Sequence, residues 1–191
     1  LPPTLHLSGA AGLELLEPIA ARGGSVGSLH PLVSLTGADS AEQLCGAWFA
    51  VEGEGGAEQL ASRIVASLGG RGLSVAASRK ALYHAAAVAA SNFVVALLGE
   101  AEEWMVQAGV PAESARAALT ELAAGAVENV GRLGPVAALT GPIARGDRAT
   151  VAAHLAQLSP SERRLYSVLA ASALDLGRER ELAEASVHDL A

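Results

Sequence analysis

The stretch RKALYHAAAVAASN runs from Arg79 to Asn92 and separates two parts of the sequence that have different patterns. Before it, short β-like runs alternate with helix-like runs that end in glycines. After it, the strand signals end and only helical patterns follow. Strand–helix alternation of this kind is typical of a mostly parallel α/β sheet. We therefore predict an α/β part over residues 1–77 and an all-helical part over residues 78–191.

Hydrophobic runs bounded by glycine, proline and capping residues place the individual elements. In the first part the sequence predicts strands at 5–7, 25–29, 48–51 and 73–76, and helices at 12–22, 40–45 and 57–68. In the second part it predicts helices at 78–108, 111–133, 147–159 and 159–182. Asp147 is an expected N-cap, and Ser159 to Glu162 reads as a capping box with proline at the first helical position.

The composition excludes several classes of protein. Of the 191 residues, 51% are apolar and only 3% aromatic, which favours helices with a core of small aliphatic side chains. The net charge of −7 argues against nucleic-acid binding. A single cysteine, Cys45, fits a reducing compartment, so we expect a cytoplasmic protein. No zinc-type spacing, phosphate loop or Gly-x-Ser-x-Gly elbow is present, and we predict no metal site.

One segment has the length of a membrane span. Residues 81–99 contain no Asp, Glu, Lys or Arg over 19 positions. The same segment contains Tyr83, His84, Ser91 and Asn92 and many weakly apolar alanines. A buried central helix is therefore the favoured interpretation, and a membrane anchor is the alternative.

Polar residues at the ends of two predicted strands point to a crevice. Ser8-Gly9 follows the first strand, and His30-Pro31 follows the second. In open parallel sheets, ligands bind outside the carboxyl ends of the strands. The alternative is that both pairs form ordinary turns.

Lys80 is the only lysine in the chain, beside 12 arginines. On a helix, positions 80, 84, 87 and 91 share one face, so Lys80, His84 and Ser91 form a polar stripe, with Asn92 close to it. A lysine changes its pKa when it is partly buried, whereas arginine stays charged. This pattern fits a site at which an ammonium releases a proton. It fits equally well the chance survival of one lysine at a helix start, with His84 and Asn92 as hydrogen-bonded polar groups of the core.

A third cluster lies in ALTGPIARGD, Ala138 to Asp147. Arg145 offers a guanidinium for a carboxylate or phosphate, and Thr140 begins the turn before it. Asn129, late in the preceding helix, either faces Lys80 or faces water. The alternative for the whole cluster is a loop whose Asp147 caps the next helix.

These residues carry a resemblance. HLSGA, GSLHPL, KALYHAAAVAASN and ALTGPIARGD resemble a bacterial group of predicted NADP-dependent oxidoreductases, in which a Rossmann-like domain precedes a helical domain of unknown function. That group belongs to the 6-phosphogluconate-dehydrogenase-like class, together with ketopantoate reductase, pyrroline-carboxylate reductase and β-hydroxyacid dehydrogenases. The resemblance implies an NADP cofactor, a small keto-acid substrate such as ketopantoate, and a homodimer formed through the helical domain.

In ketopantoate reductase and the β-hydroxyacid dehydrogenases, a lysine at the start of the long helix donates a proton, and an asparagine one turn later positions it or the substrate. Lys80 matches the lysine. His84 stands where that asparagine is expected, so His84 or Asn92 would take over its role. We accordingly predict catalytic roles for Lys80, His84 and Asn92. The predicted cofactor contacts are Ser8, Gly9, His30 and Pro31, and the predicted substrate contacts are Ser91, Asn129, Thr140 and Arg145.

The resemblance also carries a departure. The family's first strands and glycine-rich fingerprint would precede Leu1, so residues 1–77 correspond to the later part of a Rossmann-like domain. We expect NADP to bind only together with that preceding part. The alternative function is a non-catalytic helical module for dimerisation. In either case we expect no nucleic-acid or membrane partner.

Overall fold

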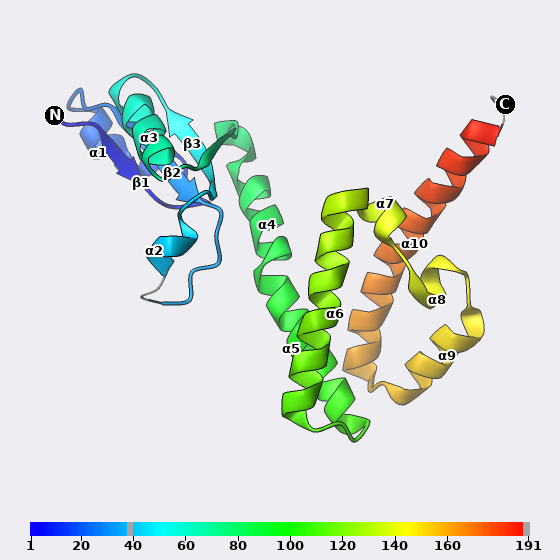
Figure 1. Ribbon diagram of the computed structural model, residues 1–191. Helices are drawn as coiled ribbons and strands as arrows, with labels where there is room; N and C mark the ends of the chain where they lie inside the picture. Colours follow the sequence, from blue (N-terminus) through cyan, green and yellow to red (C-terminus); the bar gives the residue numbers. More distant parts are fainter. Residues whose placement is uncertain (38–39, 189–191) are drawn as a thin grey trace. The chain divides into compact units, whose positions relative to one another are not determined.

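The computed structural model describes residues 1–37 and 40–188, and the chain divides into two compact units, Leu1–Glu100 and Ala101–Ala191. The first unit contains all the strands of the described residues together with the helices that pack on them (Figure 1). The second unit is helical. The predicted change from strands to helices, at residue 77, lies inside the first unit, because that unit continues through the helix that follows the sheet.

In the described part of the chain, the sheet has four strands in the order β1-β2-β3-β4. β1 pairs with β2 and β3 pairs with β4 in parallel, whereas β2 and β3 are antiparallel. Two of the three pairs are thus parallel, which confirms the predicted α/β fold. Because the direction reverses between β2 and β3, only β1 and β2 end at the edge where the candidate residues lie. The strands are β1 Thr4–His6, β2 Val26–Pro31, β3 Trp48–Gly53 and β4 Arg71–Ser74.

One long helix covers the sheet and forms its core. α3 (Gly56–Ser67) buries Ala61 and Val65 against Leu29 of β2 and Phe49 of β3. The predicted helix at 12–22 is instead a 3-10 turn followed by a short helix, because Pro18 lacks an N–H and fits only in the first turn of a helix. The remaining short elements of this part are η1 Leu13–Leu16, α1 Glu17–Ala20 and α2 Ser40–Gln43.

The predicted helix at 78–108 is broken at Ser91. A 3-10 turn, η2 (Ala77–Arg79), leads into α4 (Lys80–Ala90), and α5 (Asn92–Gln107) follows. The Ser91 hydroxyl donates a hydrogen bond to the carbonyl oxygen of Ala87 at 2.9 Å, and the Ser91 backbone leaves the helical region. Serine hydroxyls that bond back to position i−4 bend helices in this way.

The prediction that this helix is a buried central helix is wrong for the described chain. Lys80 is the only buried residue of α4, and α5 has none, because few elements of the chain pack around them. By length and composition alone, Ala77–Gln107 passes the test for a membrane-spanning helix. A single helix of this kind is weak evidence, since core helices of soluble proteins pass the same test.

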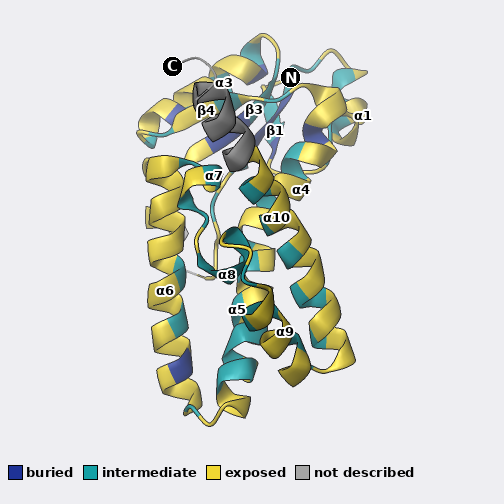
Figure 2. Ribbon diagram, turned by 90° about the vertical axis from the view of Figure 1, so that its right-hand side faces the viewer, coloured by how far each residue is buried: buried dark blue, intermediate teal, exposed yellow. Residues whose placement is uncertain are grey.

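The second unit begins and ends its helices largely at the predicted residues. The Asp147 carboxylate accepts a hydrogen bond from the Thr150 N–H at 3.1 Å, and this confirms the predicted N-cap. The Ser159 N–H donates to the Glu162 carboxylate at 2.6 Å and the Glu162 N–H donates to the Ser159 hydroxyl at 3.5 Å, which confirms the predicted capping box. Figure 2 shows this unit mainly exposed or half-buried. Its helices are α6 Ala112–Leu133, α7 Pro135–Ala138, α8 Gly141–Ala144, α9 Arg148–Gln157 and α10 Pro160–His188.

Candidate functional site

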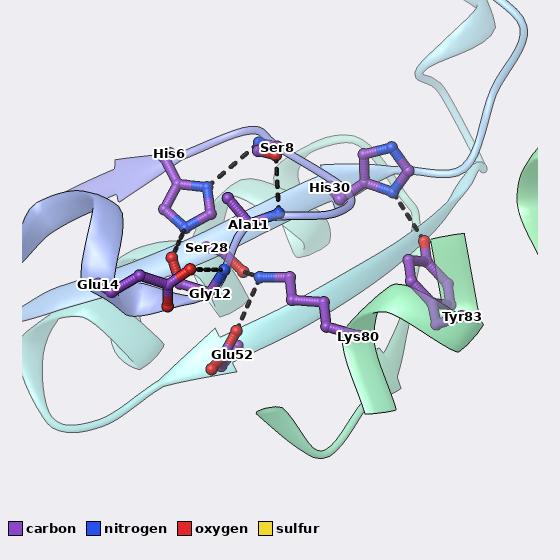
Figure 3. Close-up of polar contacts among 10 residues, drawn as sticks. All are labelled: His6, Ser8, Ala11, Gly12, Glu14, Ser28, His30, Glu52, Lys80 and Tyr83. Atoms are coloured by element: carbon purple, nitrogen blue, oxygen red, sulfur yellow. Dashed lines mark hydrogen bonds and ion pairs between the residues drawn. The ribbon is translucent and has the colours of Figure 1, made fainter. Parts of the chain in front are cut away.

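The loop after β1 is held rigidly by its own side chains (Figure 3). The Ser8 N–H donates to His6 Nδ1 at 3.2 Å, so the ring proton of neutral His6 lies on Nε2, which donates to the Gly12 carbonyl at 3.0 Å. The Ala11 N–H donates to Ser8 Oγ at 3.0 Å, and the Gly12 N–H donates to the Glu14 carboxylate at 2.8 Å. Ser8 and Gly9 are therefore presented in one fixed conformation at the carboxyl end of β1.

Gly9 brings this loop against two imidazole rings. A Cβ atom at Gly9 would lie 2.5 Å from Cδ2 of His84 and 2.7 Å from Nε2 of His30. Cβ atoms do not approach other atoms so closely, so a side chain at position 9 would push the two imidazole rings aside. The structure thus gathers Gly9, His30 and His84, which the sequence singled out on three separate segments.

His30 forms a hydrogen-bonded pair with Tyr83 of α4. The Tyr83 hydroxyl lies 2.7 Å from His30 Nδ1, and the rings meet edge to face with centroids 5.7 Å apart. The His84 ring lies 5.9 Å from that of His30. Burial lowers the pKa of His30, and positive charge at His84 and Lys80 lowers it further. Burial raises the pKa of Tyr83, so the pair is neutral near neutral pH.

A pocket of about 550 Å³ lies beside this pair, between the end of β2 and one face of α4. Its polar lining consists of His30, Ser34, Tyr83, His84, Ser91 and Asn92, and Pro31 also borders it. The apolar lining comes from residues such as Leu32, Val33, Leu73 and Val88. Five predicted site residues therefore share one pocket of the size that binds small molecules, namely His30, Pro31, His84, Ser91 and Asn92.

Lys80 differs from its predicted environment. The predicted polar stripe places Lys80 on the same helix face as His84 and Ser91, but only 3% of the Lys80 surface is exposed. Its ammonium donates to the Glu52 carboxylate at 2.7 Å and to the Ser28 hydroxyl at 2.5 Å. Figure 3 shows the Lys80 side chain pointing toward Ser28 and Glu52, while Tyr83, less than one turn later, points toward His30. Lys80 does not line the 550 Å³ pocket that His84 and Ser91 border.

Sequence reasoning missed Tyr83, Glu52 and Ser28. Tyr83 immediately precedes the predicted stripe residue His84, but it lies outside the face that positions 80, 84, 87 and 91 share. Glu52 lies in a strand, and an acidic side chain in a strand usually indicates a position that faces solvent. Only the pairing of β2 with β3, which sets Ser28 opposite Glu52, brings the two oxygens to Lys80.

A larger and more open hollow of about 940 Å³ lies at the opposite edge of the sheet, where β3 and β4 end. It is bordered by Glu52, Glu54, Glu58 and Ser74 among others, and by none of the predicted site residues. Among the described residues, no three His, Cys, Asp or Glu side chains gather closely enough to hold a metal ion. We therefore place the candidate site at the smaller pocket.

Three predicted substrate contacts lie in the second unit. Asn129 is exposed on α6 and accepts a hydrogen bond from Arg132 at 3.2 Å. Thr140 is the N-cap residue of α8, and Arg145 follows the last turn of that helix with an exposed side chain. Their roles toward a substrate stay predictions.

The fold and the pocket define a Rossmann-like α/β domain that continues into helices, with its candidate site at the ends of parallel strands. Residues 47–173 match the family described as "Domain of unknown function (DUF2520)". The chain therefore belongs to the DUF2520 family.

Three solved structures share this fold. Protein TM1727 from Thermotoga maritima is 23% identical with a TM-score of 0.77, over 93% of this chain and 69% of that one. A protein described as an NADP oxidoreductase from Bacteroides fragilis is 22% identical with a TM-score of 0.72, over 91% and 65%. Plasmodium falciparum pyrroline carboxylate reductase, solved with NADP bound, is 12% identical with a TM-score of 0.59, over 94% and 68%. No curated protein matches the chain.

Proposed function

We propose that this chain is the substrate-binding part of an NADP-dependent oxidoreductase that interconverts a small keto acid and its hydroxy acid. The observation that carries the proposal is the pocket where His30, Tyr83, His84, Ser91 and Asn92 converge at the carboxyl end of β2. Ligand sites in doubly wound sheets lie at such strand ends. The likeness of the fold to a reductase solved with NADP supports the same class of chemistry.

We assign the nicotinamide end of such a cofactor to the ends of β1 and β2. Gly9 has no side chain, so its backbone reaches both imidazoles, and Ser8 and Pro31 flank it at the two strand ends. These residues and His30 would hold the cofactor, which supplies the hydride chemistry when bound. We assign the substrate carbonyl to the neighbourhood of His84 and Asn92, and the hydroxyl groups of the substrate to Ser91.

The negative charge of a keto acid needs a cation. Among the described residues, histidines line the pocket, and no arginine or lysine does. Arg145, Thr140 and Asn129 stay predicted substrate contacts, and Arg145 is the one among them with a guanidinium, which binds a carboxylate through two parallel hydrogen bonds. Ketopantoate is the substrate to test first. Whether Lys80 donates the proton stays a prediction, and it requires the ion pair with Glu52 to open.

The test is NADPH oxidation in the presence of a panel of 2-keto acids, measured by the loss of NADPH absorbance in the protein as its gene encodes it. Ala87 borders the pocket, whereas Ala89, on the same helix, is exposed and does not. Ala87→Leu should lower kcat/KM by about 10- to 200-fold, the range that one or a few methylene groups command in an apolar pocket. Ala89→Leu should leave it unchanged. If no keto acid is reduced, or if both variants behave alike, the assignment of the pocket is wrong.

The second candidate function is a helical dimerisation module, and a specific observation favours dimer formation. Large apolar side chains are exposed on both units, among them Leu82 and Phe93 in the first and Leu122 and Val168 in the second. Monomeric proteins rarely expose so much apolar surface, so we propose a homodimer formed through the helices. Light scattering should give twice the monomer mass. A dimer without NADPH oxidation would favour the module over the enzyme.

A further inference from the structure

We propose that Tyr83 is the residue that exchanges a proton with the substrate oxygen in this pocket, and that His30 is the partner that takes up and returns that proton. This inference rests on the proposed function and names the proton path of the same site. It assigns the step to a pair that borders the pocket, whereas the ammonium of Lys80 is bound to Glu52 and Ser28.

The pair is built for proton exchange by its geometry. Tyr83 Oη and His30 Nδ1 are 2.7 Å apart, which is the short end of hydrogen-bond distances, and both side chains border the pocket. His30 lies in β2 opposite Ala50 of β3, and Tyr83 lies in the first turns of α4. Both elements are regular, so the two rings are held without ordering a loop. A substrate oxygen beside Tyr83 would complete a chain of two hydrogen bonds.

The step balances when a nicotinamide dinucleotide serves as the hydride carrier. In the oxidative direction, the hydroxyl of the substrate gives its proton to Tyr83 Oη, and the Tyr83 proton passes to His30 Nδ1. The C–H bond of the carbinol carbon breaks with its electron pair leaving as hydride, and the C–O single bond becomes a carbonyl. The substrate is oxidised, the carrier is reduced, and the imidazolium of His30 releases one proton to water. Reduction is the reverse and requires His30 to start as the imidazolium.

The surroundings of His30 set its protonation state. The charged or titratable groups near it are Tyr83, His84 and Lys80 on α4, and Glu52 offsets part of the charge of Lys80. Burial and the positive groups lower the pKa of His30 below its ordinary value of 6.5. The resting pair is therefore a neutral imidazole beside a protonated phenol, which is the form that accepts a proton. We expect the oxidative rate to fall as the pH drops through the His30 pKa.

The chain contains a matched control for this pair. In the second unit, Tyr166 Oη lies 2.9 Å from Nδ1 of His154, with ring centroids 5.8 Å apart and edge-to-face packing. This pair has nearly the same geometry, but it does not border the pocket. Tyr166→Phe removes the same hydroxyl from the same kind of contact and should leave turnover unchanged.

The experiment compares Tyr83→Phe with Tyr166→Phe in the protein as its gene encodes it, with NADPH and ketopantoate as probes. Tyr83→Phe should lower kcat by about 100-fold or more, the lower bound for a lost general acid or base, while the Kd for NADPH stays within about twofold. Lys80→Arg and His84→Gln are assayed in parallel, because the Lys80 ammonium and the His84 imidazole are the competing proton donors. If Tyr83→Phe keeps more than a tenth of the parent kcat, the proton path through Tyr83 and His30 is refuted.

A second readout does not need a working enzyme. With histidines labelled in ¹⁵N, the His30 Nδ1 resonance of the protein should shift in Tyr83→Phe and stay unchanged in Tyr166→Phe. An unchanged Nδ1 resonance in Tyr83→Phe would show that the hydrogen bond between Tyr83 and His30 is absent. That result would refute the proton path through this pair and leave the proposed function standing. If the His30 Nδ1 resonance shifts in Tyr83→Phe as expected but the parent protein transfers no hydride, the proposed function is overturned, and the proton path through Tyr83 and His30 is overturned with it.

Discussion

Replacing Glu52 by glutamine should destabilise the first unit more than any surface substitution. The change removes the carboxylate that lies 2.7 Å from the Lys80 ammonium and leaves the ammonium buried, because the side chains of Lys80 and Glu52 are only 4% and 14% exposed. Removing one partner of a buried ion pair costs about 3–5 kcal/mol, since the remaining charge is stranded without compensation. The Ser28 hydroxyl, 1% exposed, offsets only part of this loss.

The assay is urea unfolding followed by tryptophan fluorescence. Trp48 belongs to the first unit and Trp104 to the second, so a Trp104→Phe background reports the first unit alone. In that background Glu52→Gln should lower the free energy of unfolding by about 3–5 kcal/mol. The control is Glu102→Gln, which breaks the ion pair with Arg116 in the second unit, followed in a Trp48→Phe background. Since the Arg116 side chain is 70% exposed, solvent screens that pair, and the loss should be much smaller.

A double variant separates the ion pair from the space it fills. Lys80→Met with Glu52→Leu removes both charges and keeps similar volumes, so it should recover much of the loss. It leaves the Ser28 hydroxyl without its partner, which costs about 1–3 kcal/mol. A loss below about 1 kcal/mol for Glu52→Gln alone would refute the reasoning, because it would mean that water reaches Lys80.

Three further predictions concern the cofactor, the loop and pH. The 191-residue chain should bind NADPH weakly or not at all, since its sequence contains no Gly-x-Gly-x-x-Gly fingerprint for the pyrophosphate; micromolar binding in calorimetry would contradict this. Gly9→Ala should displace the rings of His30 and His84, shift the NMR signals of both and lower turnover, whereas Gly72→Ala, with nothing within 4 Å of the new Cβ, should not. Because His30 binds protons more weakly folded than unfolded, the stability of the first unit should fall as the pH drops below about 6.5, and His30→Gln should flatten that dependence in urea titrations at several pH values.

Much of the fold could be predicted because its signals are local. Glycines and capping residues mark the ends of α3, α6 and α9, and alternating strands and helices indicate the sheet. The reversal between β2 and β3 could not be predicted, because strand direction depends on pairing between distant residues. The break at Ser91 was missed since a serine inside a helical pattern is usually tolerated, and only its bond to Ala87 reveals the bend.

The candidate site was predicted in its parts and not in its connections. Gly9, His30 and His84 were each singled out, but their mutual contact depends on where α4 crosses the ends of the strands. Burial was the main error. A lysine next to an arginine at the start of a helix is usually exposed to solvent. The neighbouring sequence does not indicate that Lys80 forms an ion pair with Glu52, which lies in a distant strand. Ion pairs between segments that are distant in the sequence are especially hard to predict from a single sequence.

Lys80→Arg now distinguishes two roles for the lysine. If Lys80 donates the proton, arginine should lower kcat by about 100-fold or more, and Glu52→Gln, which keeps the lysine, should lower it far less. If Lys80 instead fastens α4 to the sheet and so holds Tyr83 at His30, both variants disturb the same anchor. Each should then reduce stability, shift the His30 Nδ1 resonance and lower kcat to a similar extent, because a planar guanidinium does not fit a site made for a point charge. The two roles are distinguished by measuring kcat, the free energy of unfolding and the His30 Nδ1 resonance on both variants. A loss of kcat of about 100-fold in Lys80→Arg, with unchanged stability and an unchanged resonance, would show that the lysine itself acts on the substrate.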